Sequence, residues 1–142
     1  MSASILLVED NAENTEMVNL LFASETSYQM RCLASPAEVL QHINEVKRLK
    51  PALFLLDYDL PEMTALELYD RLHQVEGLEH IPALIITARL PEAVKEDLRR
   101  SNIYVCFKPF DIDELLATIE QIIRDQQAIG VCEQSLLRCE SF

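Results

Sequence analysis

The sequence predicts an α/β domain built around a doubly wound, mostly parallel sheet. Five apolar runs of strand length alternate along the chain with five segments that carry helical periodicity or helix-start signals. Four of the five runs end in polar residues, as expected where strand ends share one open edge of a parallel sheet. A length of 142 residues suits a single domain that buries its own core.

The expected strands are short runs of apolar residues, several of which lack the polar alternation of a half-exposed strand. Continuous apolar runs are typical of strands that helices cover on both faces. The run at 30–33 is the weakest of the five, which favours a place at the edge of the sheet. The expected strands span residues 5–8, 30–33, 53–57, 83–86 and 104–107.

The expected helices are marked by capping signals and by apolar residues at helical spacing. Ser35 precedes a proline and stands three residues before Glu38, and Thr64 stands three residues before Glu67, so both pairs form capping boxes. The expected helices span residues 11–24, 35–49, 64–77, 91–100 and 111–127. The apolar face of the first helix is expected to hold Met17, Val18, Leu20 and Leu21.

The composition excludes several classes of partner. With 24 acidic against 12 basic residues, the net charge of −12 leaves no basic patch for a phosphate backbone, so no nucleic-acid partner is expected. No apolar run reaches the length of a membrane span, and no signal peptide opens the chain. We therefore expect no membrane partner and a cytoplasmic location. The four cysteines lack CxxC spacing and are expected to be reduced thiols.

The polar residues at the strand ends are the candidate site. Glu9 and Asp10 follow the first strand, Asp57 ends the third, and Thr87 and Lys108 follow the fourth and fifth. Since the carboxyl ends of parallel strands meet at one edge, these side chains are expected to lie together. Three neighbouring carboxylates repel one another and favour a hard divalent cation such as Mg²⁺.

An aspartate held at the end of a buried strand can act as a nucleophile toward phosphorus. Asp57 in this position would form an aspartyl phosphate. Mg²⁺ and the Lys108 ammonium would neutralise charge on the transferred phosphoryl group. The Thr87 hydroxyl would donate a hydrogen bond only once a phosphate oxygen is present, which would make it a sensor.

Four motifs give the chain a family resemblance over residues 4 to about 127. In this order and spacing they resemble the receiver domain of two-component response regulators. The motifs are Val8-Glu9-Asp10-Asn11, Asp57 with Pro61 four residues on, Thr87-Ala88, and Lys108-Pro109-Phe110.

The resemblance implies a flavodoxin-like fold with strand order 2-1-3-4-5 and five helices. It also implies a phosphoacceptor at Asp57, with Mg²⁺ bound by Asp10, Asp57 and the main-chain carbonyl of Asp59. Glu9 would act on the metal through water. Lys108 would pair with the phosphoryl group, and its peptide bond to Pro109 is expected to be cis.

The resemblance further implies a set of switch and access residues. Asp59 and Arg89 are expected to flank the mouth of the site. The family usually has glycine at the position of Ala65, and an aromatic residue three positions before the lysine, where this chain has Val105. Strand alternation predicts that Tyr104 faces the opposite side of the sheet. The implied switch and access residues are Thr87, Ala88, Arg89, Tyr104, Val105 and Pro109.

The partners and organisation follow from the same resemblance. Residues 1–127 are expected to form the receiver domain, and residues 128–142 a tail with no effector domain. The phosphodonor would be a histidine kinase or a histidine phosphotransfer protein, and the output a contact with a downstream protein. A homodimer through the last strand and the last two helices is a further expectation. The domain would assist its own phosphorylation and dephosphorylation without being an enzyme.

Two alternatives stay open. The first is a receiver-like scaffold or dimerisation module that is never phosphorylated, an interpretation that the Ala65 and Val105 departures keep in play. The second is an aspartyl-phosphate phosphatase, because Asp57-Tyr58-Asp59 resembles the DxD signature of the haloacid-dehalogenase type. That signature is expected at a first strand, whereas here it follows the third.

Overall fold

A five-stranded, all-parallel sheet forms the centre of the molecule, with the strands in the order β2-β1-β3-β4-β5. The computed structural model describes residues 3–88, 102–108 and 111–127. The strands are β1 (Ser4–Val8), β2 (Gln29–Leu33), β3 (Leu53–Asp57), β4 (Ala83–Thr87) and β5 (Ile103–Phe107). The predicted fold class and strand order are thereby confirmed.

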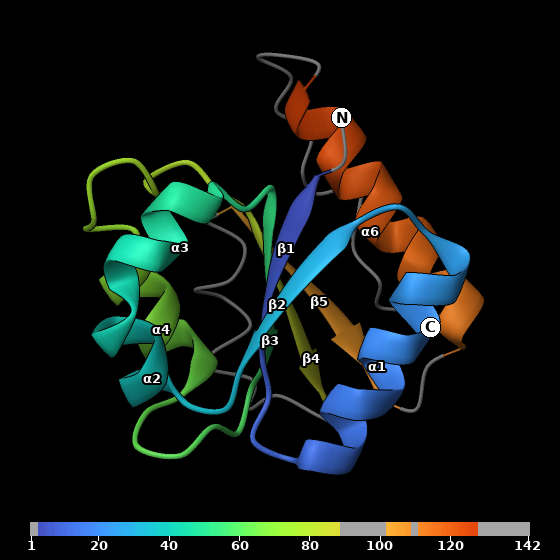
Figure 1. The fold of residues 1–142 in the computed structure, drawn as a ribbon, viewed down its shortest axis with the longest axis horizontal. Coiled ribbons are helices and arrows are strands. Elements are labelled where there is room, and N and C mark those ends of the chain that lie inside the picture. The colour runs from blue at the N-terminus through green and yellow to red at the C-terminus, as the bar shows by residue number, and fades with distance from the viewer. Residues whose placement is uncertain (1–2, 89–101, 109–110, 128–142) are drawn as a thin grey trace.

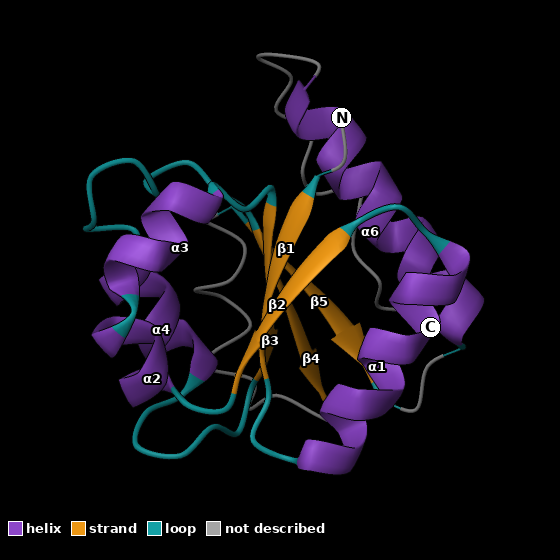
Figure 2. Cartoon of the chain, in the orientation of Figure 1, coloured by secondary structure: helices purple, strands orange, loops and turns teal. Residues whose placement is uncertain are grey.

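Helices cover both faces of this sheet (Figure 1). One face carries α2 (Pro36–Gln41), α3 (Ile43–Leu49) and α4 (Ala65–Leu72), and the other carries α1 (Ala12–Glu25) and α6 (Ile112–Gln127). Figure 2 shows the resulting three layers of helix, strand and helix. The predicted helix at 91–100 and the predicted tail at 128–142 lie outside the described residues.

The core is divided between the two faces of the sheet because successive side chains of each strand point to opposite sides. Leu56 of β3 packs toward α2, α3 and α4, while its neighbour Leu55 packs toward α1 and α6. Both leucines are fully buried. The continuous apolar runs in the sequence therefore mark strands with two covered faces. In the described part of the chain, no helix combines the length and the apolar character that crossing a membrane requires.

Two of the predicted helices differ from the observed ones. The predicted helix at 35–49 is broken at His42, which leaves helical geometry at φ −106° and ψ 27° while its ring Nδ1 lies 2.9 Å from the Glu38 carbonyl oxygen. The predicted helix at 64–77 ends earlier, at Leu72. Here the His73 ring Nε2 lies 2.8 Å from the Ile81 carbonyl oxygen, a contact that ties the helix end to the following loop.

The predicted apolar face of α1 is wrong for two of its members. Val18 and Phe22, one turn apart, are buried against the sheet, whereas Met17 and Leu20 are 51% and 64% exposed. Helix residues are spaced by about 100°, so position 17 lies beside the stripe that positions 18 and 22 define, and position 20 lies on the opposite side of the helix.

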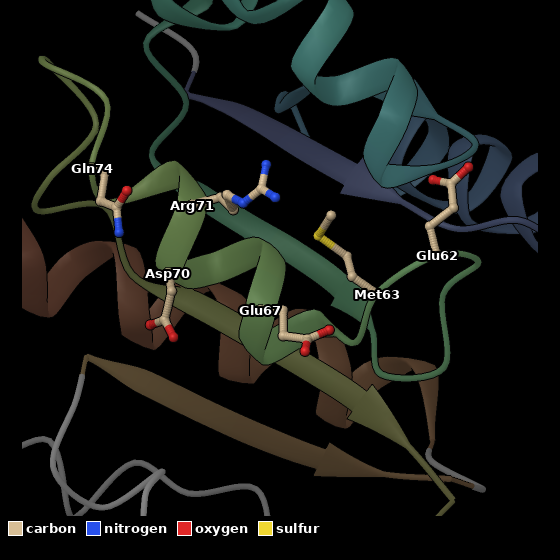
Figure 3. Close-up of a pocket in the computed structure, with 6 residues that line it drawn as sticks. All are labelled: Glu62, Met63, Glu67, Asp70, Arg71 and Gln74. Carbon is tan, nitrogen blue, oxygen red and sulfur yellow. The ribbon is translucent and has the colours of Figure 1, made fainter.

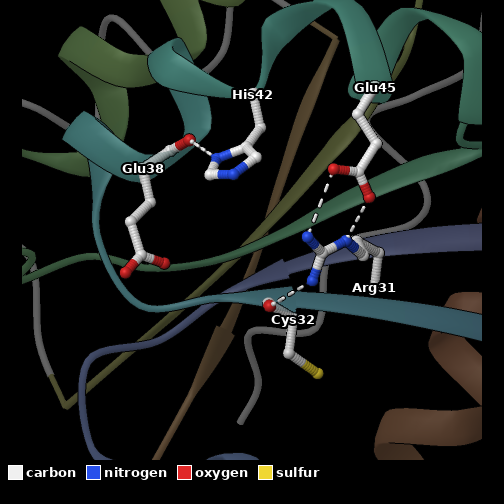
Figure 4. Close-up of polar contacts among 5 residues, drawn as sticks. All are labelled: Arg31, Cys32, Glu38, His42 and Glu45. Atoms are coloured by element: carbon white, nitrogen blue, oxygen red, sulfur yellow. Dashed lines mark hydrogen bonds and ion pairs between the residues drawn. The ribbon is translucent and has the colours of Figure 1, made fainter.

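The edge strand β2 is tied to α3 by an ion pair (Figure 4). The Arg31 Nε donates to Glu45 at 2.6 Å and a second guanidinium nitrogen donates to the same carboxylate at 3.3 Å. A third nitrogen donates to the Cys32 carbonyl oxygen at 3.3 Å. This bidentate geometry holds a charged side chain along the outermost strand, a feature that discourages pairing with another chain.

Matched leucines test this description of the core. Leu56→Ala removes a fully buried side chain from the central strand, and we expect the free energy of unfolding to fall by about 2–5 kcal/mol. Leu20→Ala removes an exposed side chain of the same type, and we expect a change within about 0.5 kcal/mol. Urea denaturation followed by circular dichroism measures both. Equal losses in the two variants would contradict the assigned burial.

Candidate functional site

Three carboxylates meet at the carboxyl edge of the sheet. Glu9 and Asp10 follow β1, and Asp57 ends β3, the strand that pairs with β1 up to Val8 and Leu56. One carboxylate oxygen from each of the three residues lies within 4.8 Å of the others. The parallel register produces this cluster, because it brings the residues that follow Val8 level with the end of β3. The juxtaposition predicted from the strand ends is therefore observed.

Asp10 is available to this cluster because another residue caps the following helix. The side-chain oxygen of Asn11 accepts a hydrogen bond from the Asn14 N–H at 3.0 Å, so Asn11 is the N-cap of α1. The D-x-x-E pattern of Asp10 and Glu13 is an alternative capping signal in the sequence, and the structure does not use it. Asp10 is exposed at the end of β1.

Glu9 is the more enclosed of the two acids after β1. Its N–H donates to the Leu33 carbonyl oxygen at 3.1 Å, and its carboxylate accepts from the Asn11 N–H at 3.2 Å. Burial raises the pKa of Glu9, and the neighbouring Asp57 charge raises it further. A bound cation would oppose both effects.

Asp57 pairs with Lys108. Among the described residues, Lys108 supplies the only amine at this cluster. The Lys108 Nζ lies 3.4 Å from Asp57 Oδ1, and the Asp57 side chain is 13% exposed. Burial raises the pKa of Asp57, the ammonium lowers it, and Asp10 and Asp59 add smaller increases. The net direction is upward, so a single ammonium does not compensate the burial and repulsion of this carboxylate.

The main chain fixes Lys108 and Thr87 relative to each other. The Lys108 N–H donates to the Thr87 carbonyl oxygen at 2.8 Å, which continues the β4–β5 ladder beyond the strand ends. Thr87 closes β4, and only 2% of its surface is exposed. Its strand partner in β5 is Phe107. Sequence reasoning did not single out Phe107, because the register of two strands cannot be read from either strand alone.

The loop between β3 and α4 is held at both ends. The Tyr58 carbonyl oxygen accepts hydrogen bonds from the N–H groups of Leu60 and Ala65, both at 3.2 Å. Glu62 adopts a left-handed φ of 69°, and its carboxylate accepts from the Ala37 N–H of α2 at 3.3 Å. Exposed Asp59 therefore sits in a loop whose shape is fixed by its neighbours.

The structure explains why alanine can stand at position 65, where the family usually has glycine. Ala65 is the first residue of α4, follows the N-cap Thr64 and is fully buried. The Thr64–Glu67 capping box that the sequence predicted is present, with reciprocal bonds of 3.0 and 3.3 Å. A helical position of this kind accepts an alanine, because it does not need the conformational freedom of glycine.

Apart from Thr87, which closes β4, the predicted switch residues divide into three groups. Tyr104 is buried toward α1 and α6, and Val105 is buried on the opposite face, so the predicted alternation is confirmed. Ala88 is exposed directly after β4. Arg89 and Pro109 lie outside the described residues, and so does the predicted cis bond at Pro109.

A hollow of 420 Å³ lies elsewhere, beside α4 (Figure 3). It contains none of the predicted site residues. Its lining comes from the loop after β3, from one side of α4 and from the turn that follows α4, namely Glu62, Met63, Glu67, Asp70, Arg71 and Gln74. The chemically distinctive constellation is the carboxylate cluster, which offers hard oxygen ligands of the kind that Mg²⁺ binds.

Comparison with known proteins agrees with this geometry. Residues 5–120 match the sequence profile of the response regulator receiver domain. The chain is 28% identical over 127 residues to the polar-differentiation response regulator DivK of Brucella ovis, a match that covers 88% of this chain and 99% of that protein.

Solved structures show the same fold. A putative response regulator from Chloroflexus aurantiacus is 26% identical with a TM-score of 0.73, covering 87% of this chain and 99% of its own. The receiver domain of sensor histidine kinase PA1611 from Pseudomonas aeruginosa, with a magnesium ion coordinated in its active site cleft, is 24% identical with a TM-score of 0.71 and the same coverage. The chain belongs to the response regulator receiver domain family.

Proposed function

We propose that Asp57 accepts a phosphoryl group and that this modification is the signalling event of the protein. The single observation that carries the proposal is the cluster at the sheet edge. Three carboxylates lie within 4.8 Å of one another, and the Lys108 ammonium lies 3.4 Å from Asp57. Family membership makes the chain a phosphoacceptor of two-component signalling, and this cluster supports the choice of residue.

The carboxylate cluster is suited to hold Mg²⁺. Asp10, Asp57 and the Asp59 carbonyl would bind it, with Glu9 acting through water. The fit rests on the donor set, which has three acids of hard oxygen chemistry and one nearby ammonium. The magnesium ion in the PA1611 receiver domain supports the same choice of cation. When bound, Mg²⁺ would neutralise charge on the phosphoryl oxygens.

The transfer step would be a displacement at phosphorus. An Asp57 carboxylate oxygen would attack the phosphoryl group of a phosphohistidine, forming an O–P bond as the N–P bond breaks and the imidazole leaves with its electron pair. Lys108 would stabilise the negative charge on the transferred oxygens from the side where it now pairs with Asp57. In this way the domain would assist its own phosphorylation. Attack by water on the same phosphorus would break the O–P bond, restore the Asp57 carboxylate and release inorganic phosphate.

The partners follow from this chemistry. A histidine kinase or a histidine phosphotransfer protein would supply the phosphoryl group, and a downstream protein would read the result. Residues 1–127 would act as the receiver unit, with cytoplasmic partners and a homodimer through the last strand and last two helices as further expectations. The net charge of −12 favours partner surfaces of basic character.

Intact-mass measurement tests the phosphoacceptor. Incubation with Mg²⁺ and a small-molecule phosphodonor should add one phosphate to the wild-type chain, because the carboxylate cluster and Lys108 assemble without a partner protein. Asp57→Asn should show no gain, whereas Asp70→Asn, at an exposed acid on α4, should behave as wild type. Absence of any gain in the wild-type chain would favour the scaffold alternative, and a gain in Asp57→Asn would place the acceptor elsewhere.

The raised pKa of Asp57 predicts how stability depends on pH and on metal. A raised folded-state pKa means that the charged carboxylate destabilises the fold above that pKa, and that the penalty vanishes below the unfolded pKa of about 3.9. In EDTA at pH 7, Asp57→Asn should therefore unfold at a higher temperature than wild type, and the difference should close as the pH approaches 4.

Mg²⁺ should make the wild type more stable than Asp57→Asn, the reverse of the order in EDTA. At ten times its dissociation constant, the cation should stabilise the wild type by about 1.4 kcal/mol, because it binds the folded cluster only. Asp57→Asn should gain much less. Calorimetric unfolding with and without Mg²⁺ measures both effects. Equal stabilisation of the two proteins by Mg²⁺ would contradict the assignment of Asp57 as a ligand.

A further inference from the structure

Glu62, in the loop between β3 and α4, has a backbone conformation that is unusual for its residue type. Among the described residues, two that are not glycine have a positive φ, namely Lys50 at 49° and Glu62 at 69°. Lys50 is the C-cap of α3, where a left-handed residue is common. Glu62 lies instead at the centre of a tight turn, in which the Met63 N–H donates to the Pro61 carbonyl oxygen at 2.9 Å. A three-residue turn with a positive φ at its centre is rare and strained.

The Glu62 side chain reaches a helix that lies far away in the sequence. Its carboxylate accepts a hydrogen bond from the Ala37 N–H, in the first turn of α2, at 3.3 Å. In Figure 3 the Glu62 side chain points away from α4. Of the hydrogen bonds that residues 58–64 make within the described part of the chain, this is the one that joins the loop to α2.

This bond completes the N-terminal cap of α2. The helix begins with Pro36, which has no N–H to satisfy, and the Glu38 N–H donates to the Ser35 hydroxyl at 3.2 Å. The Ala37 N–H between them is the remaining donor of this first turn, and Glu62 is its partner. Because buried residues pack α2 onto the core, the contact ties the loop to a fixed element.

The same loop carries one of the ligands proposed for Mg²⁺. Asp59, whose carbonyl would bind the cation, is exposed and stands three positions before Glu62. Before it, the Tyr58 N–H donates to the Ile86 carbonyl oxygen at 3.0 Å, and the Tyr58 carbonyl oxygen accepts from the Ala65 N–H at 3.2 Å. These bonds fix the ends of the loop. The contact between Glu62 and α2 fixes its middle, so the place of the Asp59 carbonyl depends on it.

We propose that Glu62 is a positioning residue of the metal site, a role that rests on the magnesium binding proposed above. By accepting from the Ala37 N–H, its carboxylate keeps the strained turn closed and holds the Asp59 carbonyl in place for the cation. Without this bond the loop would leave the turn, and the shape that binds Mg²⁺ would be one among several. The apparent affinity falls in proportion to the fraction of molecules in the binding shape. Glu62 acts through the main chain and is not itself a ligand.

Two-dimensional NMR of ¹⁵N-labelled chain, titrated with Mg²⁺, tests this role. Glu62→Ala removes the acceptor, and we expect the dissociation constant for Mg²⁺ to rise about fivefold, the effect of losing one hydrogen bond of ordinary strength. Glu62→Gln keeps an acceptor oxygen at the same reach and should bind Mg²⁺ within about twofold of the wild type. The Ala37 amide proton signal should move upfield in Glu62→Ala and stay near its wild-type position in Glu62→Gln.

A charge control separates the position of the loop from simple attraction between an acid and a cation. Asp70→Asn removes one negative charge from an exposed position of α4 and should leave the Mg²⁺ affinity within about twofold of the wild type. Binding by Glu62→Gln as weak as that of Glu62→Ala would overturn the positioning role, because the charge and not the hydrogen bond would then matter. Wild-type affinity in Glu62→Ala would overturn it as well.

The same titration tests the metal site separately. In the wild type, the signals that Mg²⁺ shifts should include the amides of Asp10 and Asp57, and Asp57→Asn should bind the cation much more weakly. If the wild type shows no Mg²⁺ binding at these residues, the proposed metal site fails and the role of Glu62 fails with it. Binding at these residues with an affinity that does not depend on Glu62 overturns only the role of Glu62.

Discussion

Electrostatic crowding at one edge of the sheet is the constraint on which the rest of the structure depends. The parallel register brings one carboxylate oxygen each of Glu9, Asp10 and Asp57 to within 4.8 Å of one another, and among the described residues the Lys108 ammonium is the cation that faces them. The pKa values of Glu9 and Asp57 are raised because burial and mutual repulsion outweigh that ammonium. A site of this kind gains from binding a cation, and the cation in turn equips Asp57 to react with a phosphoryl group.

The packed core holds the three carboxylates together in spite of their repulsion. Leu53 to Leu56 of β3 are fully buried between two layers of helix, so the strand that presents Asp57 cannot shift to relieve repulsion. The adjoining loop is equally constrained, by hydrogen bonds to the Tyr58 carbonyl and by the Glu62 contact with α2. Asn11 caps α1, and its side chain rather than that of Asp10 satisfies the helix end. Asp10 is therefore not used as a helix cap, and the packed strand β3 holds Asp57 at the sheet edge, where both acids can bind a cation.

Most of this arrangement could be predicted from the sequence because continuous apolar runs identify doubly covered strands, and parallel strands collect their carboxyl ends at one edge. What could not be predicted depends on contacts between distant residues. The early end of α4 involves the contact between His73 and the Ile81 carbonyl, and the pairing of Thr87 with Phe107 depends on the register of two strands. The exposure of Met17 and Leu20 depends on which stripe of α1 meets the sheet.

Reductive trapping of the acyl phosphate tests the central claim most directly. Borohydride converts a phosphorylated aspartate to homoserine, and peptide mass spectrometry then locates the modified residue. After reaction with a phosphodonor and Mg²⁺, homoserine should appear at position 57 and at no other acid of the cluster. Modification at Asp10 or Asp59 instead, with position 57 unchanged, would contradict the account, because the phosphoryl group would then be carried by an acid to which the structure gives a different role.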